Sequence, residues 1–276
     1  MDCSRFVFFL VPEFSLYGLV PAIEALRIAN QNSEQTFYKW SLRSIDGKPV
    51  RSSSGMIFAV DGKIAESKDH DTIVVCAGNH PLQYCGRRAL RWLSHQARHG
   101  KTLMSIDSGS FLLAEAGLLK GHRATVHWEV LQLLEERYPE VQVAEALFVT
   151  DRRCITCAGG IAALDMMLYL IQVQHGEGLA QIVANGFVHL RRMNPEAPQI
   201  AGSHLCAPAL DRRIRRLFQV MEANVQTSLQ IGALAKRANL SLRQLERLVQ
   251  RHFSTTPRVL YSRVRLNAGR VHLFHG

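Results

Sequence analysis

The sequence of 276 residues has no apolar run as long as the roughly 18 residues of a membrane-spanning helix, because charged side chains interrupt every candidate. The first apolar stretch, residues 6–11, is short and lacks a basic leader and a small-residue cleavage site, so we expect a core strand there and no signal peptide. Six cysteines in a chain of this size do not form a disulfide framework. We therefore predict a cytoplasmic protein with reduced thiols and no membrane partner.

Motifs that bind metals are equally scarce. Cys154 and Cys157 form a C-x-x-C, but no second pair with zinc-site spacing accompanies it. The surrounding segment predicts two short strands, on which residues three apart point to opposite faces. We predict that both cysteines are structural and that the protein holds neither a metal nor a cofactor.

Acidic residues are nearly missing from the last quarter of the chain. Residues 205–276 contain 13 Lys and Arg but only Asp211, Glu222 and Glu246, whereas residues 1–204 contain 20 charged residues of each sign. The net charge of +10 therefore lies entirely in this short segment. A strongly basic segment attached to a neutral body favours a polyanionic partner, with nucleic acid as the first choice and a membrane surface as the second.

Strand and helix patterns alternate over residues 1–190, which is typical of a mostly parallel sheet with helices on both faces. The apolar run at residues 71–76 ends in Ala77-Gly78, as a buried parallel strand does. We expect strands at residues 6–11, 38–44, 71–76, 100–107, 141–143 and 148–157, and helices at residues 19–30, 87–99, 111–116, 128–137 and 161–174. This pattern predicts a doubly wound α/β domain.

A proline-, glycine- and polar-rich stretch follows, and we predict an interdomain linker at residues 191–207. Residues 208–276 predict a small all-α domain. In its first helix Ile214, Leu217, Phe218, Met221 and Val225 share a face. The other expected helices span residues 228–238, 241–253 and 258–271, the last one after a break at Pro257.

The second and third of these helices have helix-turn-helix form. Ser241 is expected to cap the third helix, whose apolar side carries Leu242, Leu245, Leu248 and Val249. Arginine and glutamine can make paired hydrogen bonds to guanine and adenine in the major groove, which admits a helix. We predict contact with double-stranded DNA, against the alternative of a solvated basic helix, by Ser241, Arg243, Gln244, Arg247, Gln250 and Arg251.

Residues 229–247 and 253–266 resemble the first helix-turn-helix and the linker helix of AraC/XylS-type transcriptional regulators. That family usually has a second helix-turn-helix after the linker helix. Since this chain stops at Gly276, we expect the second module to be missing. A single module makes fewer phosphate contacts, so we expect weaker and more salt-sensitive binding.

Residues 105–119 read as a strand, a sharp glycine turn and a helix. Such a unit projects one residue at the carboxyl end of a sheet, as in nucleophile elbows and in plain ligand sites. The projected residue here is Asp107. Its carboxylate can accept N–H bonds and attract a cation, but it cannot replace a thiolate in acyl transfer.

This unit, with residues 121–128 and 158–165, resembles the class I glutamine amidotransferase-like domain of the PfpI-like superfamily. Joined to an AraC-type tail, it resembles a GlxA-type transcriptional regulator, which implies a flavodoxin-like fold. Enzymes of the superfamily have a cysteine at the elbow, a nearby histidine, and an acidic residue near the first helix. Here Asp107 replaces the cysteine, Tyr17 stands at the acidic position, and His127 is kept. We therefore predict no catalytic residues and no enzyme.

Related regulators use the same site to sense small metabolites, including amino acids and quaternary amines such as betaine and carnitine. The resemblance implies an effector of this class. Asp107 is expected to face an ammonium group, aromatic rings to add cation–π contacts, and N–H groups at the start of a helix to hold a carboxylate. The expected ligand residues are Phe14, Tyr17, Asp107, Ser108, Phe111, His127, Trp128, Gly159 and Gly160.

Together these features predict a ligand-responsive DNA-binding transcriptional regulator, which the resemblance leads us to expect as a homodimer formed through the α/β domain. Two alternatives stay open. One is a PfpI-like hydrolase or amidase, against which the aspartate at the elbow speaks. The other is a small-molecule binding protein without independent DNA binding, which the missing second module would favour.

Overall fold

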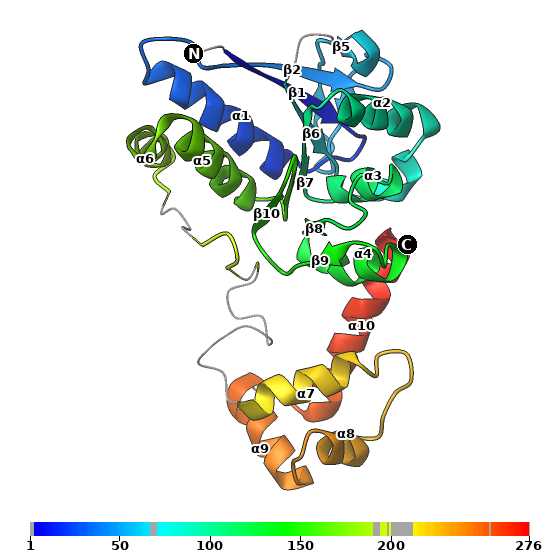
Figure 1. Cartoon of the computed structure of the whole chain (residues 1–276). Coiled ribbons are helices and arrows are strands. Elements are labelled where there is room, and N and C mark those ends of the chain that lie inside the picture. The colour runs from blue at the N-terminus through cyan, green and yellow to red at the C-terminus, as the bar shows by residue number, and fades with distance from the viewer. Residues whose placement is uncertain are drawn as a thin grey trace. The chain divides into compact units, whose positions relative to one another are not determined.

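The structure is a computed structural model that describes residues 3–66, 71–189, 194–197, 199, 212–253 and 255–275. The chain divides into two compact units, and the first ends at Gln199. The first unit is a sheet with helices, and the second consists of helices (Figure 1). Among the described helices none is both long and apolar enough to cross a membrane.

The sheet of the first unit has seven strands in the order β10-β11-β7-β6-β1-β2-β5. All neighbours are parallel except β10 and β11. This confirms the predicted doubly wound, mostly parallel sheet. The strands are β1 (Ser4–Leu10), β2 (Tyr38–Ser44), β5 (Gly62–Lys63), β6 (Thr72–Cys76), β7 (Thr102–Ile106), β10 (Phe148–Asp151) and β11 (Cys154–Cys157). Two short pairs lie outside it, β3 (Val50–Arg51) with β4 (Ile57–Phe58) and β8 (Arg123–Ala124) with β9 (Gln142–Val143).

Helices cover both faces of this sheet (Figure 1). The helices α1 (Leu16–Gln31), α5 (Ala162–His175) and α6 (Glu177–Gly186) lie on one face, and α2 (Arg87–Arg98) and α3 (Gly109–Glu115) on the other. Side chains of β1 alternate between the two faces: Phe6 and Phe8 belong to the same core cluster as α1 and α5, whereas the Phe9 ring packs on Trp92 of α2 at 5.9 Å. The core thus fills both layers between sheet and helices.

Three local expectations differ from the structure. The helix predicted at residues 128–137 begins as a 3-10 turn, Trp128–Val130, and only then becomes α4 (Leu131–Arg137). Helix α6 was not predicted, because two of its ten residues are glycines, which weaken the helical pattern. The helix predicted from residue 19 begins earlier, at Leu16, and contains Pro21.

The second unit contains α7 (Arg212–Glu222), α8 (Ile231–Arg237), α9 (Leu242–Phe253) and α10 (Pro257–His275). Its core is made by apolar side chains from all four helices, among them Leu217, Leu234, Leu245 and Leu260. Two expectations were wrong: α8 starts at Ile231 instead of residue 228, and Leu242 is 48% exposed although it was placed on the apolar face. Pro257 begins α10, where a missing N–H costs no helical hydrogen bond.

Most of the linker predicted at residues 191–207 lies outside the described residues. Those parts that are described pack against the first unit. Pro195 accepts a hydrogen bond from the N–H of Leu147 at 2.9 Å, and Glu196 forms a two-pronged ion pair with Arg123. Gln199 donates from Nε2 to Thr125 Oγ1 at 3.1 Å, and also to the carbonyls of Val126 and Ala146. The end of the first unit is therefore anchored to the segment that precedes His127.

Candidate functional site

Asp107 follows directly on β7, in the sharp turn that leads to α3. Its φ of 59° lies in the left-handed region, which non-glycine residues rarely adopt. Its N–H donates to the carbonyl of Cys157 at 3.1 Å, so the turn is attached to the end of β11. A side chain at Gly109 would bring its Cβ within 2.3 Å of the Val75 carbonyl oxygen, which is why this position needs glycine. The strained residue is thus the one that the sequence predicted to project.

The Asp107 carboxylate is half-buried among polar partners. The Ser108 hydroxyl donates to Oδ1 at 3.2 Å, and the Ser15 side chain also favours the ionised carboxylate. A Cβ added to Gly159 would lie 2.9 Å from Oδ2, so this glycine leaves room for the carboxylate. Burial raises the pKa of Asp107 above its usual value, against the opposing effects of the charge on His127 and of the two serines. Ionised Asp107 is therefore poorly compensated inside the protein.

Two of the expected aromatic residues are accessible. Tyr17 is 64% exposed and lies beside Gly160, where an added Cβ would be 3.5 Å from its ring. Trp128 is 37% exposed, and its ring centre is 5.7 Å from that of His127. These contacts place Tyr17 beside Gly160 and Asp107 beside Gly159, and they place Trp128 beside His127, whose charge acts on Asp107.

The other two aromatic residues belong to the core. Phe14 has no exposed surface, and its ring packs edge-on against Phe58 at 5.6 Å. Phe111 has none either, and its ring packs against Tyr138 at 6.2 Å. A buried ring offers no face to a ligand, so the site described by this structure does not include Phe14 or Phe111. The packing of both rings against residues far away in the sequence could not be read from local spacing.

The expected carboxylate cradle at the start of α5 is largely used by the protein itself. The N–H of Gly159 donates to Cys157 Sγ at 3.3 Å. The N–H groups of Ala162 and Ala163 donate to the carbonyls of Gly159 and Gly160. The helix begins at Ala162, later than the sequence suggested, so the glycines form a turn in front of it.

Sequence reasoning missed Ser15. A serine just before an apolar helix predicts a helix cap, and this residue does occupy the N-cap position of α1. Its contact with Asp107 depends on β1 and β7 lying in the same sheet, with β6 between them. No local pattern contained that information.

In the second unit, Ser241 and Gln244 form a reciprocal cap at the start of α9. The N–H of Gln244 donates to Ser241 Oγ at 3.2 Å, and the N–H of Ser241 donates to Gln244 Oε1 at 2.9 Å. This is the capping box, which satisfies two N–H groups that a helix start leaves free. The predicted cap is therefore present, and the side-chain oxygen of Gln244 is engaged in it.

All six residues predicted to contact DNA are exposed in this structure. Arg243, Arg247 and Gln250 are spaced four and three residues apart, so they form one stripe along α9. The opposite side of the helix, with Leu245, Leu248 and Val249, is buried in the core of the unit. The helix thus presents a polar, cationic face to solvent.

The start of α10 is fixed to the loop between α7 and α8. The Tyr261 hydroxyl donates to the carbonyl of Asn224 at 2.6 Å, and Arg265 Nε donates to that of Val225 at 2.9 Å. Arg237 donates to the side chain of Asn224 at 2.7 Å. These bonds tie the loop before α8 to both α8 and α10, and the shared apolar core joins α9 to the same folded module.

Comparisons with known proteins agree with this fold. Residues 4–173 match the model of the DJ-1/PfpI family. The HTH-type transcriptional regulator CdhR of Pseudomonas aeruginosa is 40% identical over 269 residues, which are 96% of this chain and 79% of that protein. The HTH-type transcriptional regulator GlxA of Rhizobium meliloti is 32% identical over 270 residues, 98% of this chain and 83% of that protein.

Two further similarities each cover about two thirds of the chain. The crystal structure of an AraC family transcriptional regulator from Pseudomonas putida superposes with a TM-score of 0.62 at 30% identity, covering 67% of this chain and 99% of that chain. An isonitrile hydratase of Pseudomonas putida is 30% identical over 178 residues, 64% of this chain and 74% of that protein. Relatives that match nearly the whole chain are thus named regulators, as the sequence resemblance predicted, and the protein belongs to the DJ-1/PfpI family, within its group of HTH-type transcriptional regulators.

Proposed function

We propose that the protein is a DNA-binding regulator that responds to a small cationic metabolite bound at Asp107. The observation that carries this proposal is the Asp107 carboxylate itself: it is projected by a strained turn and half-buried, and its charge is only partly compensated. A bound cation would supply the missing compensation.

The surroundings of the carboxylate favour an ammonium or quaternary ammonium group. Tyr17 exposes its ring beside Gly160, and Trp128 exposes its ring beside His127, whose charge acts on Asp107. Aromatic faces attract cations, most strongly where water is partly excluded. Amino acids and quaternary amines such as betaine or carnitine are therefore the effectors to test first.

A route from this site to the end of the first unit supports a regulatory role. His127 and Trp128 follow directly on Thr125 and Val126, which are two of the three residues that accept hydrogen bonds from Gln199. A ligand that changes the position of His127 would act on this anchor. Such a ligand shifts the equilibrium between two states only if it binds one of them more tightly.

The second unit supports DNA binding through α9. Its exposed stripe of Arg243, Arg247 and Gln250 has the donors that read guanine and adenine in the major groove. We further propose that two copies associate through the first unit, which would present two α9 helices to two half-sites.

Thiol chemistry at this site is disfavoured. Residue 107 is an aspartate. Cys157, whose carbonyl accepts the hydrogen bond from the N–H of Asp107, is fully buried. Burial raises the pKa of Cys157 to about 12, so its thiol is protonated at neutral pH. Because the thiolate is the nucleophile, Cys157 cannot take the place of a catalytic cysteine.

The test is a thermal-shift screen of the full chain against amino acids, betaine, carnitine and polyamines, with Asp107→Ala beside the wild type. A specific ligand at a hundredfold excess over its Kd should stabilise the wild type by about 2.7 kcal/mol. Asp107→Ala should lose this shift, whereas Glu34→Gln, a change of an exposed carboxylate elsewhere, should keep it. A shift of equal size in Asp107→Ala would remove Asp107 from the site.

A further inference from the structure

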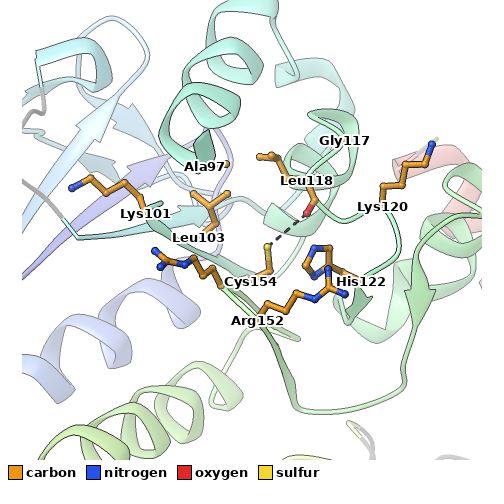
Figure 2. A pocket seen from close by; sticks show the side chains of 10 residues that line it. Ala97, Lys101, Leu103, Gly117, Leu118, Lys120, His122, Arg152 and Cys154 are labelled. Carbon is orange, nitrogen blue, oxygen red and sulfur yellow. Dashed lines mark hydrogen bonds between the residues drawn. The ribbon is translucent and has the colours of Figure 1, made fainter. Parts of the chain in front are cut away.

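A second region of the first unit is built like a binding site and has no part in the proposal above. A cavity of about 460 Å³ opens at the amino ends of β7 and β11, between Leu103 and Cys154 (Figure 2). Asp107 lies beyond the opposite end of β7, and Gly159 beyond the opposite end of β11. The cavity and the Asp107 site are therefore separated by the length of the strands.

The walls of the cavity are cationic. The cavity is lined by four basic side chains and a histidine, namely Lys101, Lys120, Arg152, Arg153 and His122. None of the described residues that line it is acidic. Lys101 and Lys120 lie on opposite sides of the opening, and the Arg152 guanidinium lies beside the His122 ring (Figure 2). The ammonium groups of the two lysines point away from each other, and an anion bound at the opening would reduce the repulsion between the like charges that surround it.

The adjacent Asp151 compensates only one of these charges. It accepts a hydrogen bond from the N–H of Arg123 at 2.8 Å, and its carboxylate lies 3.3 Å from His122 Nδ1 and 3.9 Å from Arg152 Nε. The thiol at the floor adds no negative charge, since burial raises the pKa of Cys154 to about 11. A surplus of positive charge therefore remains at the walls.

The floor of the cavity is apolar. Leu103 and Cys154 are buried there, and the Cys154 thiol is turned to the carbonyl of Leu118, with 3.7 Å between sulfur and oxygen. Cationic walls above an apolar floor suit an anion that carries a short carbon skeleton. A bare inorganic ion or a long polymer would leave that floor unused.

The backbone at Arg152 points to a use for its side chain. Arg152 and Arg153 form the two-residue turn between β10 and β11, with Asp151 and Cys154 paired on either side. Arg152 has a φ of 54°, a conformation for which such turns usually carry glycine or asparagine. Strained backbone conformations of this kind are concentrated at functional sites. Its neighbour Arg153 is held by a hydrogen bond to the carbonyl of Gly100.

We propose that this cavity is a second ligand site of the first unit, which binds a small organic anion with two or more negative charges, such as a dicarboxylate or a phosphorylated metabolite. Dicarboxylates and phosphorylated metabolites both carry negatively charged oxygen atoms on a short carbon chain, which is the chemistry that this site would recognise. The inference does not depend on the Asp107 site, because the two share no residue.

The experiment is isothermal titration of the full chain with succinate and, separately, with glycerol 3-phosphate, at constant ionic strength. The decisive variant is Arg152→Gly, which removes one charge and also relieves the strained turn, so loss of folding does not confuse the result. Lys120→Gln is the second variant, and its side chain is exposed. Lys48→Gln, an exposed lysine between β2 and β3, is the matched control.

One of the two anions should bind the wild type saturably, and Arg152→Gly should weaken that binding at least tenfold while its Tm stays equal or rises. Lys48→Gln should change it by less than twofold. Which anion binds tells the carboxylate source from the phosphate source. If both Arg152→Gly and Lys120→Gln bind the anion as the wild type does, the proposal is overturned. It is also overturned if the heat of titration saturates with neither anion. Weaker DNA binding by Arg152→Gly with no anion binding would assign the surface to nucleic acid and overturn it too.

Discussion

The Ser15 side chain favours the ionised form of the Asp107 carboxylate and makes no bond to the N–H groups of its own helix, although Ser15 is the N-cap residue of α1. Serine at this position ordinarily caps the helix, which stabilises a protein by about 1 kcal/mol. Here the side chain of Ser15 instead stabilises the half-buried charge of Asp107, in the turn between β7 and α3. The elbow and the first helix are thus joined by a polar contact that supports the ionised form of Asp107.

Replacing Asp107 by asparagine should stabilise the ligand-free protein at neutral pH. Burial raises the pKa of Asp107, so the stabilising contribution belongs to the protonated form and is lost as the pH rises through the raised pKa. A neutral amide avoids this loss. We therefore expect the free energy of unfolding to rise by about 1 kcal/mol, as it commonly does when a destabilising functional residue is replaced. Urea denaturation at pH 7 measures it, and the gain should shrink as the pH is lowered.

Asp46 provides a control of opposite sign. The N–H of Lys48 bonds to its carboxylate and lowers the pKa of Asp46. Its stabilising contribution is therefore present at neutral pH and is lost as the pH falls through the lowered pKa. Asp46→Asn should destabilise the protein at pH 7. An Asp107→Asn protein that is also destabilised would contradict our account of the elbow.

Binding of the cationic effector should weaken in acid. A cation favours ionised Asp107, and the pKa of this group lies above its ordinary value of about 3.9. As the pH falls through the raised pKa, the affinity should decrease by up to about tenfold for each further pH unit. Titrations of the effector found in the screen, from pH 8 down to the lowest pH at which the chain stays folded, measure this slope. A slope of zero in the wild type would show that the effector does not touch the carboxylate.

Arg247→Ala should weaken DNA binding without affecting the fold. Arg247 is exposed in the middle of the stripe on α9. Loss of an arginine that contacts a base costs about 1–3 kcal/mol, and loss of a phosphate contact lowers the salt dependence instead. Fluorescence anisotropy with a DNA duplex at two salt concentrations separates the two roles. Arg27→Ala, on α1 of the other unit, is the matched control, and equal affinities of both variants would exclude α9 as the reading helix.

Gln244 can be tested for its two roles separately. Its Oε1 accepts the N–H of Ser241, and a glutamate keeps this capping box. Gln244→Glu should therefore retain the stability of the second unit but lose DNA affinity, since a carboxylate repels phosphates. Gln244→Ala should lose part of the cap as well, which we expect to cost about 1 kcal/mol in thermal denaturation. If Gln244→Glu binds DNA like the wild type, this side chain does not face the duplex.

Gln199→Ala should separate effector binding from the DNA response. Gln199 Nε2 donates to Thr125, Val126 and Ala146, and these bonds hold the end of the first unit to the segment before His127. Without them the effector should still bind with its normal Kd, but its influence on DNA affinity should fall. Anisotropy with and without effector measures the coupling. Glu196→Gln, which alters the neighbouring ion pair with Arg123 on the surface, is the control, and normal coupling in Gln199→Ala would exclude this route.

Much of this protein follows from its sequence. The alternation of apolar strands and amphipathic helices predicted the parallel sheet, because these periodicities depend only on neighbouring residues. The strand, sharp turn and glycine around Asp107 predicted the elbow in the same local way. The excess of Lys and Arg after residue 204, together with Ser241 and the spacing of Arg243 and Arg247, predicted the helix-turn-helix and its cap.

Contacts between distant segments were decided only by the tertiary structure. Three relationships join parts of the chain that lie apart in sequence. They are the packing of the buried rings of Phe14 and Phe111, the effect of Ser15 on Asp107, and the hydrogen bonds of Gln199. The basic cavity is the clearest case, since Lys101, Lys120 and Arg152 come together only because β7 and β11 are neighbours in the sheet. Local periodicity determines which elements form, whereas the order of strands determines which side chains meet, and that order is set by the packing of the whole unit.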